Sequence, residues 1–441
     1  MRSPRYAPKA SRCIVSDSAG AATIARAKPH VRAHVSIAAT FFVHALLFAS
    51  WTAHIPHIKD RLQLDDGALG TALLGAPIGS VTAMTIASWL LPRLGSKRMI
   101  QATVVGYAAG GVAVGLADST ILLFAALAFW GLFQGALDVA MNTQAVTVER
   151  AVAAPIMSRL HGIWSIGGFS GALVGAGAVA IGLELSVQLA GLGSIAIALI
   201  WALSRPLIAD GAKPAATEPN PTRGHLSVTV LTLGGIAFAS MLCEGAVADW
   251  SATYLRDDLG AGAASSGLGY AAYAFTMVLT RLNGAVLQRR FGNRTLLPAL
   301  ATVYAVGMCA ALAVRQPTVA LLGFAAMGVG LALLVPSAFS AAGAVGQDNS
   351  HGSAIAAVAA LGWFGYVSGP PLIGHLADRT GLSAALWMLP ALAIVIAATA
   401  RFSGAFGIDA PRRWFRKLWD RRSPTGFPRI RPTGNRCPDE C

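Results

Sequence analysis

The sequence is short of charge. Asp, Glu, Lys and Arg together make up 12% of its 441 residues, whereas hydrophobic residues make up 55%. A soluble domain carries roughly 25% charged residues, so a soluble multidomain protein is excluded. Between Arg159 and Arg205 the one acidic or basic side chain apart from His161 is Glu184. Runs of about 18 or more apolar residues are typical of membrane spans, and the sequence therefore predicts a polytopic membrane protein.

Cysteine and the common catalytic motifs are also scarce. The five cysteines form no C-x-x-C pair, which argues against a disulfide framework and a zinc site. The sequence contains no P-loop, no H-E-x-x-H and no G-x-S-x-G. An ATP-driven pump, a membrane protease and a hydrolase are therefore disfavoured. We expect neither enzymatic activity nor a cofactor or metal.

The positive net charge does not indicate a nucleic-acid partner. The net charge is +14, but the basic residues lie in the two tails and in short segments between apolar runs. This distribution is typical of a membrane protein with a basic cytoplasmic side. The expected partner of the basic segments is an anionic lipid bilayer.

Twelve apolar segments predict an all-α membrane protein with twelve transmembrane helices. They cover approximately 35–58, 68–91, 99–117, 120–146, 160–182, 185–204, 227–255, 264–287, 295–314, 317–345, 352–376 and 382–402. A polar loop rich in Pro, Ala and Gly separates the sixth segment from the seventh. The expected units are a basic arm, an N-terminal half, a central loop, a C-terminal half and a basic tail, at 1–34, 35–204, 205–226, 227–402 and 403–441.

The distribution of Lys and Arg predicts the orientation. With twelve spans, the loops on the side of the two termini hold 27 Lys and Arg, against five in the loops on the other side. Positive residues accumulate on the cytoplasmic side. Both termini are therefore expected in the cytoplasm.

An internal repeat relates the two halves. Trp51-Thr-Ala recurs as Trp250-Ser-Ala, and Arg93-Leu-Gly95 recurs as Arg290-Phe-Gly292, with offsets of about 198 residues. Leu69-Gly and Ser170-Gly recur at nearly the same offset. Four matches in order predict two pseudo-symmetric six-helix halves, an architecture found in one large class of transporters.

These features resemble the major facilitator superfamily. The loops at Arg93-Leu-Gly95 and Arg290-Phe-Gly292 resemble its G-x-x-x-D-R-x-G-R-[RK] loop, although Pro92 stands at the Asp position. A cleaner match, Gly374 to Gly381, lies between the last two helices, where the signature is not expected. Segments 50–56 and 138–142 look like a bacterial branch that contains rhizopine-type and sugar-type permeases. The resemblance implies alternating access, a cavity lined by helices 1, 4, 7 and 10, and a gating role for Arg93, Gly95, Arg290 and Gly292.

Charged residues within the spans are candidates for chemistry, because burying them in a membrane is costly. Gln134, Asp138 and Asn142 are four residues apart and form one polar stripe. They predict a substrate site, with Asp138 also a proton site, or alternatively a buried hydrogen-bond cluster. Glu244 is the best candidate for proton coupling, and its alternative role is a structural pair with Arg281.

Helix 1 carries further candidates. His44 and Trp51 share one broad face with His54, and they predict substrate contacts or, alternatively, an interfacial aromatic. Asp249 is expected to cap the helix or to pair with Arg256 near the surface. Trp164 and Trp363 are expected to pack or to anchor at the interface. The glycines at 167, 171 and 175 predict close contact of helix 5 with a neighbour.

Together these observations predict a monomeric secondary active transporter of the bacterial inner membrane. It would move a small polar solute, sugar-like or a related metabolite, by proton-coupled alternating access. One alternative is the efflux of drugs or metabolites. The other is a membrane sensor or scaffold that uses the same fold without transport.

Overall fold

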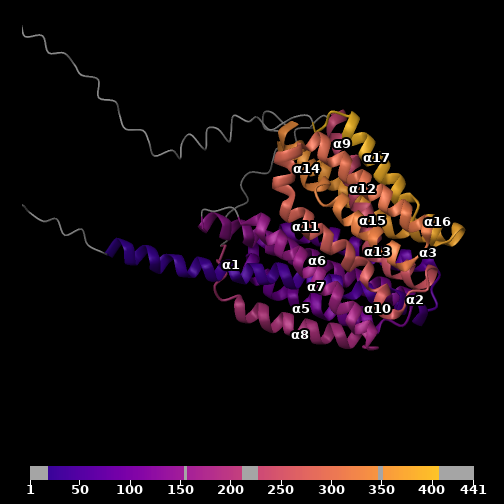
Figure 1. Cartoon of the computed structure of the whole chain (residues 1–441). Helices are drawn as coiled ribbons and strands as arrows, with labels where there is room; N and C mark the ends of the chain where they lie inside the picture. Colours follow the sequence, from indigo (N-terminus) through magenta and orange to yellow (C-terminus); the bar gives the residue numbers. More distant parts are fainter. Residues whose placement is uncertain (1–17, 153–155, 211–226, 346–350, 407–441) are drawn as a thin grey trace, which may run out of the picture.

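The computed structural model describes residues 18–152, 156–210, 227–345 and 351–406, and its regular elements within these ranges are all helices (Figure 1). Half of the expected basic arm and most of the expected central loop and basic tail lie outside the described residues. The helix α1 begins at Ser18, well before the expected start at residue 35. The segment from Ser18 to Lys28 is rich in alanine, which has the highest helix propensity.

The N-terminal half is formed by residues up to Leu203. Its elements are α1 (Ser18–Trp51), η1 (Thr52–His54), α2 (Ile55–Arg61), α3 (Asp66–Leu73), α4 (Gly75–Leu94), α5 (Ser96–Leu116), α6 (Thr120–Val152), α7 (Met157–Ala180) and α8 (Leu185–Leu203). The first span is α1 with η1 and α2, and the second is α3 with α4.

The C-terminal half begins at Val228. Its elements are α9 (Val228–Thr253), η2 (Tyr254–Asp258), α10 (Ala263–Ser266), α11 (Leu268–Phe291), α12 (Asn293–Val314), α13 (Pro317–Leu331), α14 (Leu334–Val345), α15 (His351–Thr380), α16 (Leu382–Ala385) and α17 (Met388–Phe402).

Eleven helices in the described ranges are long and apolar enough to cross a membrane. The twelfth expected span is α11, which is long enough but carries Arg281, Arg289 and Arg290. These polar residues lower its hydropathy below that of the other spans. It packs against α13 as α4 packs against α6, so it occupies the position of a span in the C-terminal half.

The two halves repeat the same helix neighbours. In the N-terminal half α1 packs on α7 and α5 packs on α8; in the C-terminal half α9 packs on α15 and α12 packs on α17. This equivalence confirms the predicted fold of twelve helices in two pseudo-symmetric halves.

The glycine stripe of α7 explains its close contact with α1. A Cβ added at Gly167, Gly171 or Gly175 would collide with a backbone carbonyl of α1, at successive turns of that helix. Small residues at this spacing let the two backbones approach each other. The prediction that these glycines bring helix 5 against a neighbour is confirmed, and the neighbour is helix 1.

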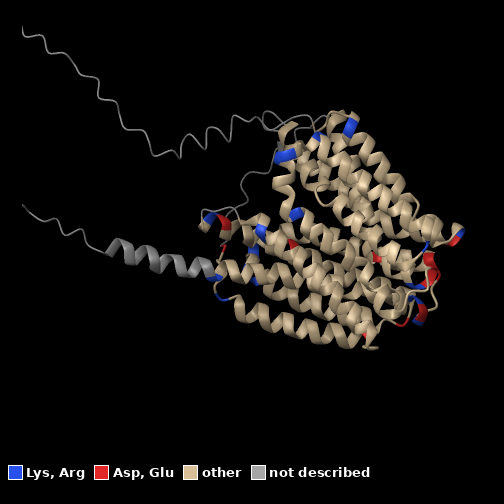
Figure 2. Ribbon diagram, viewed as in Figure 1, with Lys and Arg blue, Asp and Glu red and all other residues tan. Residues whose placement is uncertain are grey.

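Charged residues are concentrated at the two ends of the bundle, and few lie between them (Figure 2). Large apolar side chains are exposed along the helices between these ends, among them Trp89, Phe364 and Leu322. Such a belt suits a lipid surface. The protein is therefore a multi-pass membrane protein.

We call one end of the bundle the terminal face; it holds the turns at Gly95, Ile156 and Gly292. The other end, with the turns at Asp118 and Gly381, is called the latch face.

The halves meet through α3 against α15 and through α7 against α11 (Figure 1).

Candidate functional site

A cavity of about 200 Å³ lies between the two halves. It is smaller than the roughly 300–1,000 Å³ typical of pockets for drug-sized ligands, which suits a small solute. Six of the spans contribute to its lining. The lining residues are His44, Phe48, Ala76, Pro77, Ser80, Met84, Gln134, Gly135, Asp138, Trp164, Met241, Glu244, Trp363 and Tyr366.

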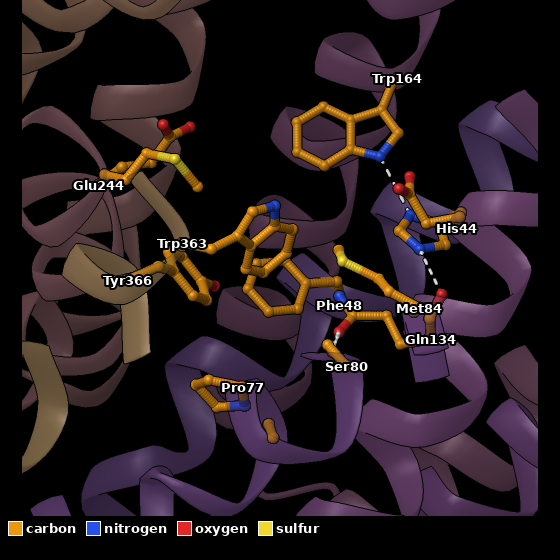
Figure 3. A pocket seen from close by; sticks show the side chains of 14 residues that line it. His44, Phe48, Pro77, Ser80, Met84, Gln134, Trp164, Glu244, Trp363 and Tyr366 are labelled. Carbon is orange, nitrogen blue, oxygen red and sulfur yellow. Dashed lines mark hydrogen bonds between the residues drawn. The ribbon is translucent and has the colours of Figure 1, made fainter. Parts of the chain in front are cut away.

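The cavity has an N-terminal and a C-terminal side. Figure 3 shows His44, Gln134 and Ser80 on one side, and Glu244, Trp363 and Tyr366 on the other. The first group comes from α1, α4 and α6, and the second from α9 and α15. A solute in this cavity would therefore contact both halves.

His44 is held by hydrogen bonds at both of its ring nitrogens. Nδ1 accepts a hydrogen bond from the indole N–H of Trp164 at 3.0 Å, and Nε2 lies 3.3 Å from the carbonyl oxygen of Gln134. These partners require a proton on Nε2 and none on Nδ1, which is the neutral imidazole. His44 therefore offers a solute its ring surface, since both nitrogens are already used.

The polar stripe of α6 is divided by the structure. Gln134 and Asp138 line the cavity, and Asn142 lies one turn beyond them. The hydroxyl of Ser80 lies 3.2 Å from Gln134 Oε1 and 3.0 Å from the carbonyl oxygen of Gly131. Asn142 Nδ2 donates to Asp138 Oδ1 at 3.2 Å. Asn142 therefore supports Asp138 from outside the cavity.

Arg281 has partners other than Glu244. Its guanidinium donates to the carbonyl oxygen of Ala332 at 3.3 Å and to Ser165 Oγ at 3.4 Å. Ala332 lies at the break between α13 and α14, and Pro336 four residues later has no N–H to donate to its carbonyl. Arg281 supplies that hydrogen bond. No ion pair joins Arg281 to Glu244 in the described part of the chain.

The charges that line the cavity are all of one sign. Asp138 and Glu244 are carboxylates on opposite halves, and the lining contains no Lys or Arg. Neither carboxylate has an ion-pair partner among the described residues. The cavity is therefore acidic, with aromatic walls.

Some predicted residues lie away from the cavity. Trp51 is buried with its ring edge against Trp130, at 5.6 Å between ring centroids. His54 Nε2 lies 2.9 Å from Gln188 Oε1. Asp249 does not pair with Arg256, contrary to expectation, because Arg256 contacts Asp60 and Asp257 instead.

Several lining residues escaped the sequence analysis or were given another role. Trp164 and Trp363 were expected to pack or anchor, and both line the cavity. Phe48 lies one turn after His44, and Tyr366 lies one turn after Trp363. This spacing could have identified both, because residues three or four apart share a helix face.

The predicted gating residues lie on the terminal face. Gly95 separates α4 from α5 with a φ of 74°, and Gly292 separates α11 from α12 with a φ of 70°. Positive φ favours glycine, since it has no Cβ. The guanidinium of Arg93 stacks over the ring of Trp89, and Arg290 lies over Phe291. No hydrogen bond or ion pair to the C-terminal half is seen for Arg93 in the described part of the chain.

An ionic network connects the halves at the latch face. Arg256 contacts Asp60 at 2.8 Å, and Lys59 contacts Asp66 at 2.7 Å and Asp257 at 3.4 Å. Lys59, Asp60 and Asp66 belong to the N-terminal half, and the other two belong to the C-terminal half. The network therefore ties the turn after the first span to its counterpart after the first span of the C-terminal half.

Asp378 adds a second connection, from the segment that most resembles the family's loop signature. Its Oδ1 accepts a hydrogen bond from the backbone N–H of Gly67 at 2.9 Å. Gly67 lies in the first turn of α3, where N–H groups lack helical partners and a negative charge is favourable. Thr71 Oγ1 also lies 3.2 Å from His375 Nε2. We call Asp378 and the first turn of α3 the latch.

Comparison with known proteins identifies the family. The family model for the Major Facilitator Superfamily matches residues 232–429. An uncharacterised MFS-type transporter of Yersinia pestis is 31% identical over 378 residues, which are 85% of this chain and 96% of that protein. Membrane protein MosC of Rhizobium meliloti is 29% identical over 374 residues, covering 83% of this chain and 89% of that one.

The fold agrees with this assignment. The solved structure of the nucleoside transporter NupG is similar with a TM-score of 0.67 and 13% identity, covering 85% of this chain and 99% of that one. The chain belongs to the major facilitator superfamily and is a membrane transporter. The resemblance inferred from the repeat and the loop motifs is confirmed.

Proposed function

We propose that this protein is a secondary active transporter that moves a small polar solute by alternating access, coupled to protons. The observation that supports this most is a cavity lined by both halves of a repeated fold. A site at the interface of two repeats can be exposed to each side in turn when one half rocks against the other.

The contacts between the halves favour one state of such a cycle. In the described residues, the hydrogen bonds and ion pairs that join the halves lie at the latch face, apart from that of Arg281 to Ser165 at mid-depth. We propose that the latch face is periplasmic and that the terminal face and both termini are cytoplasmic, in the inner membrane of a bacterium. The structure then corresponds to a state closed to the outside.

We propose that Glu244 couples transport to protons and that Asp138 contributes to both solute and proton binding. Both carboxylates lie in the cavity without a basic partner among the described residues. Such groups in a membrane are typical of proton relays and ion pathways. Gln134 and Ser80 complete the polar side of the solute site, and His44 contributes its ring surface.

The test uses purified protein in proteoliposomes loaded with a pH-sensitive dye. Each member of a panel of sugars, nucleosides, amines and carboxylic acids is added under an imposed pH gradient. A solute that the protein transports should move protons as well. Glu244→Gln should abolish proton movement and accumulation and leave solute counterflow measurable.

Asp249→Asn is the matched control for that variant, because Asp249 is a carboxylate of the same helix that does not line the cavity. It should retain proton movement. Normal proton-coupled accumulation by Glu244→Gln would exclude Glu244 as the coupling group. Parallel loss of binding, counterflow and accumulation, together with a lower unfolding temperature in the absence of solute, would instead show a structural role.

A further inference from the structure

We infer that the solute carries a positive charge, as a small organic cation such as an amine. The inference rests on the proposed transport function and concerns its substrate class. It starts from the charge of the cavity, which contains the carboxylates of Asp138 and Glu244 and no Lys or Arg in its lining.

Among the described residues, no basic group forms an ion pair with either carboxylate. Arg281 is engaged with Ala332 and Ser165. His44 is neutral, because its Nδ1 accepts the hydrogen bond of Trp164. A buried charge without a partner is costly. A cation that enters the cavity would supply the missing opposite charge, whereas an anion would be repelled by both carboxylates.

The aromatic walls favour a cation for a separate reason. Phe48, Trp164, Trp363 and Tyr366 line the cavity, and Trp363 and Tyr366 lie edge to face with ring centroids 5.7 Å apart. An ammonium group within about 6 Å of an aromatic face is attracted by the ring quadrupole. Figure 3 shows these two rings on the same side as Glu244, so a ring face and a carboxylate are available to one ammonium group.

The polar groups on the opposite side suit the rest of the solute. Ser80 and the side chain of Gln134 offer hydrogen bonds to hydroxyl groups. A solute with an ammonium group at one end and hydroxyl groups at the other would match both sides of the cavity. The cavity volume of about 200 Å³ limits it to a small molecule.

The experiment compares isosteric probes that differ in charge. Thermal unfolding of the purified protein in detergent is measured with choline and with 3,3-dimethylbutanol, which has the same shape without the charge. Glucosamine and glucose form a second pair, and glucuronate supplies an anion. Choline, glucosamine or both should raise the unfolding temperature, and their neutral partners should not.

Substitution of the carboxylates tests where the cation binds. Asp138→Asn or Glu244→Gln should weaken the binding of the stabilising cation by about 30-fold or more, as expected for the loss of one partner of a buried charge pair. Asp249→Asn should leave it unchanged. The neutral amide variants preserve shape, and each variant's unfolding temperature without probe shows whether it has folded.

The outcomes separate this inference from the proposed function. Equal or greater stabilisation by a neutral probe or by glucuronate would overturn the inference, and so would a lack of stabilisation by both cations. Proton-coupled transport of a neutral solute would leave the proposed function standing without the inference. Binding of a cation without any transport would sustain the inference and contradict the proposed function.

Discussion

At the scale of single residues, two tryptophans of the N-terminal half differ in what their indole N–H groups do. The N–H of Trp164 donates to His44 Nδ1 at 3.0 Å. The N–H of Trp51 has no hydrogen-bond partner among the described residues. The first therefore fixes the orientation and protonation of a cavity residue, and the second contributes packing alone.

This difference predicts unequal effects of the same substitution. Trp164→Phe removes a donor and leaves His44 Nδ1 unsatisfied, which costs about 1–3 kcal/mol beyond the lost packing. Trp51→Phe removes an N–H that made no hydrogen bond. We expect Trp164→Phe to lower the unfolding temperature more than Trp51→Phe. Equal decreases would show that the hydrogen bond to His44 contributes little.

The sequence alone showed part of this site. Asp138, Gln134, Glu244 and His44 were identifiable because polar residues stand out within apolar spans. The partners of these residues were not, because Trp164 reaches His44 across 120 positions of sequence. Trp51 was as conspicuous in the sequence, but it packs against Trp130 and does not line the cavity. The type of a residue indicates whether it is buried, but it does not indicate which face of its helix lines the cavity.

At the scale of the helices, the contact between α1 and α7 depends on the absence of side chains. Adding a methyl group at Gly171 would force it into the carbonyl oxygen of Leu46. Overpacking of this kind typically costs about 1–3 kcal/mol. We expect Gly171→Ala to lower the unfolding temperature and to reduce the amount of folded protein recovered from membranes.

Gly168 provides the matched control for this prediction. It belongs to the same helix, and a Cβ there would meet nothing within 4 Å. Gly168→Ala should be neutral or slightly stabilising, because alanine has the higher helix propensity. A similar loss in both variants would indicate that flexibility of α7, and not its contact with α1, requires glycine.

The latch offers a second prediction for the helices. Asp378→Ala removes a cap from the first turn of α3 and breaks a connection between the halves. A cap contributes about 1 kcal/mol. Its loss should change the ratio of molecules with the latch face open to those with it closed about fivefold. Spin labels at Asp118 and Ala384, in a background without native cysteines, should report a larger population with the latch face open.

Asp65→Ala distinguishes the latch from helix stability. Asp65 caps the same helix by accepting from the N–H of Ala68 at 2.7 Å, but it belongs to the same half. Its loss should destabilise α3 without changing the distance between the labels. If both variants open the latch face equally, the stability of α3 and not the bond across the halves controls the state. The ion pair between Arg256 and Asp60 is expected to stabilise the closed latch face less than Asp378 does, because the Asp60 side chain is 64% exposed.

At the scale of the whole molecule, the repeat and the distribution of charge made the architecture predictable. Matching segments about 198 residues apart pointed to two halves, and the structure shows equivalent helix neighbours in both. The break at Ala332 and the capping role of Arg281 were not predictable, because they depend on how α11 lies against α13 and α14. The similarity of Gly374 to Gly381 to the loop signature was visible, but its contact with α3 was not.

The proposed orientation can be measured directly. A reporter that works in the cytoplasm and fails in the periplasm should be active when fused after Arg223 and inactive when fused at Arg315. A periplasmic reporter at the same two positions should give the opposite pattern and serves as the control. Activity of the cytoplasmic reporter at Arg315 would contradict the assignment of the latch face to the periplasm.

The placement of one carboxylate on each half has a consequence for the empty carrier. When the halves close around the cavity, Asp138 and Glu244 are brought toward each other in a medium that screens charge weakly. Without an occupant, their mutual repulsion opposes closure of the two halves. It therefore slows the return of the empty carrier to the other side of the membrane. A cation or a proton would relieve that repulsion. The carrier would thus reorient when a cation or a proton occupies the cavity and stall when neither is bound.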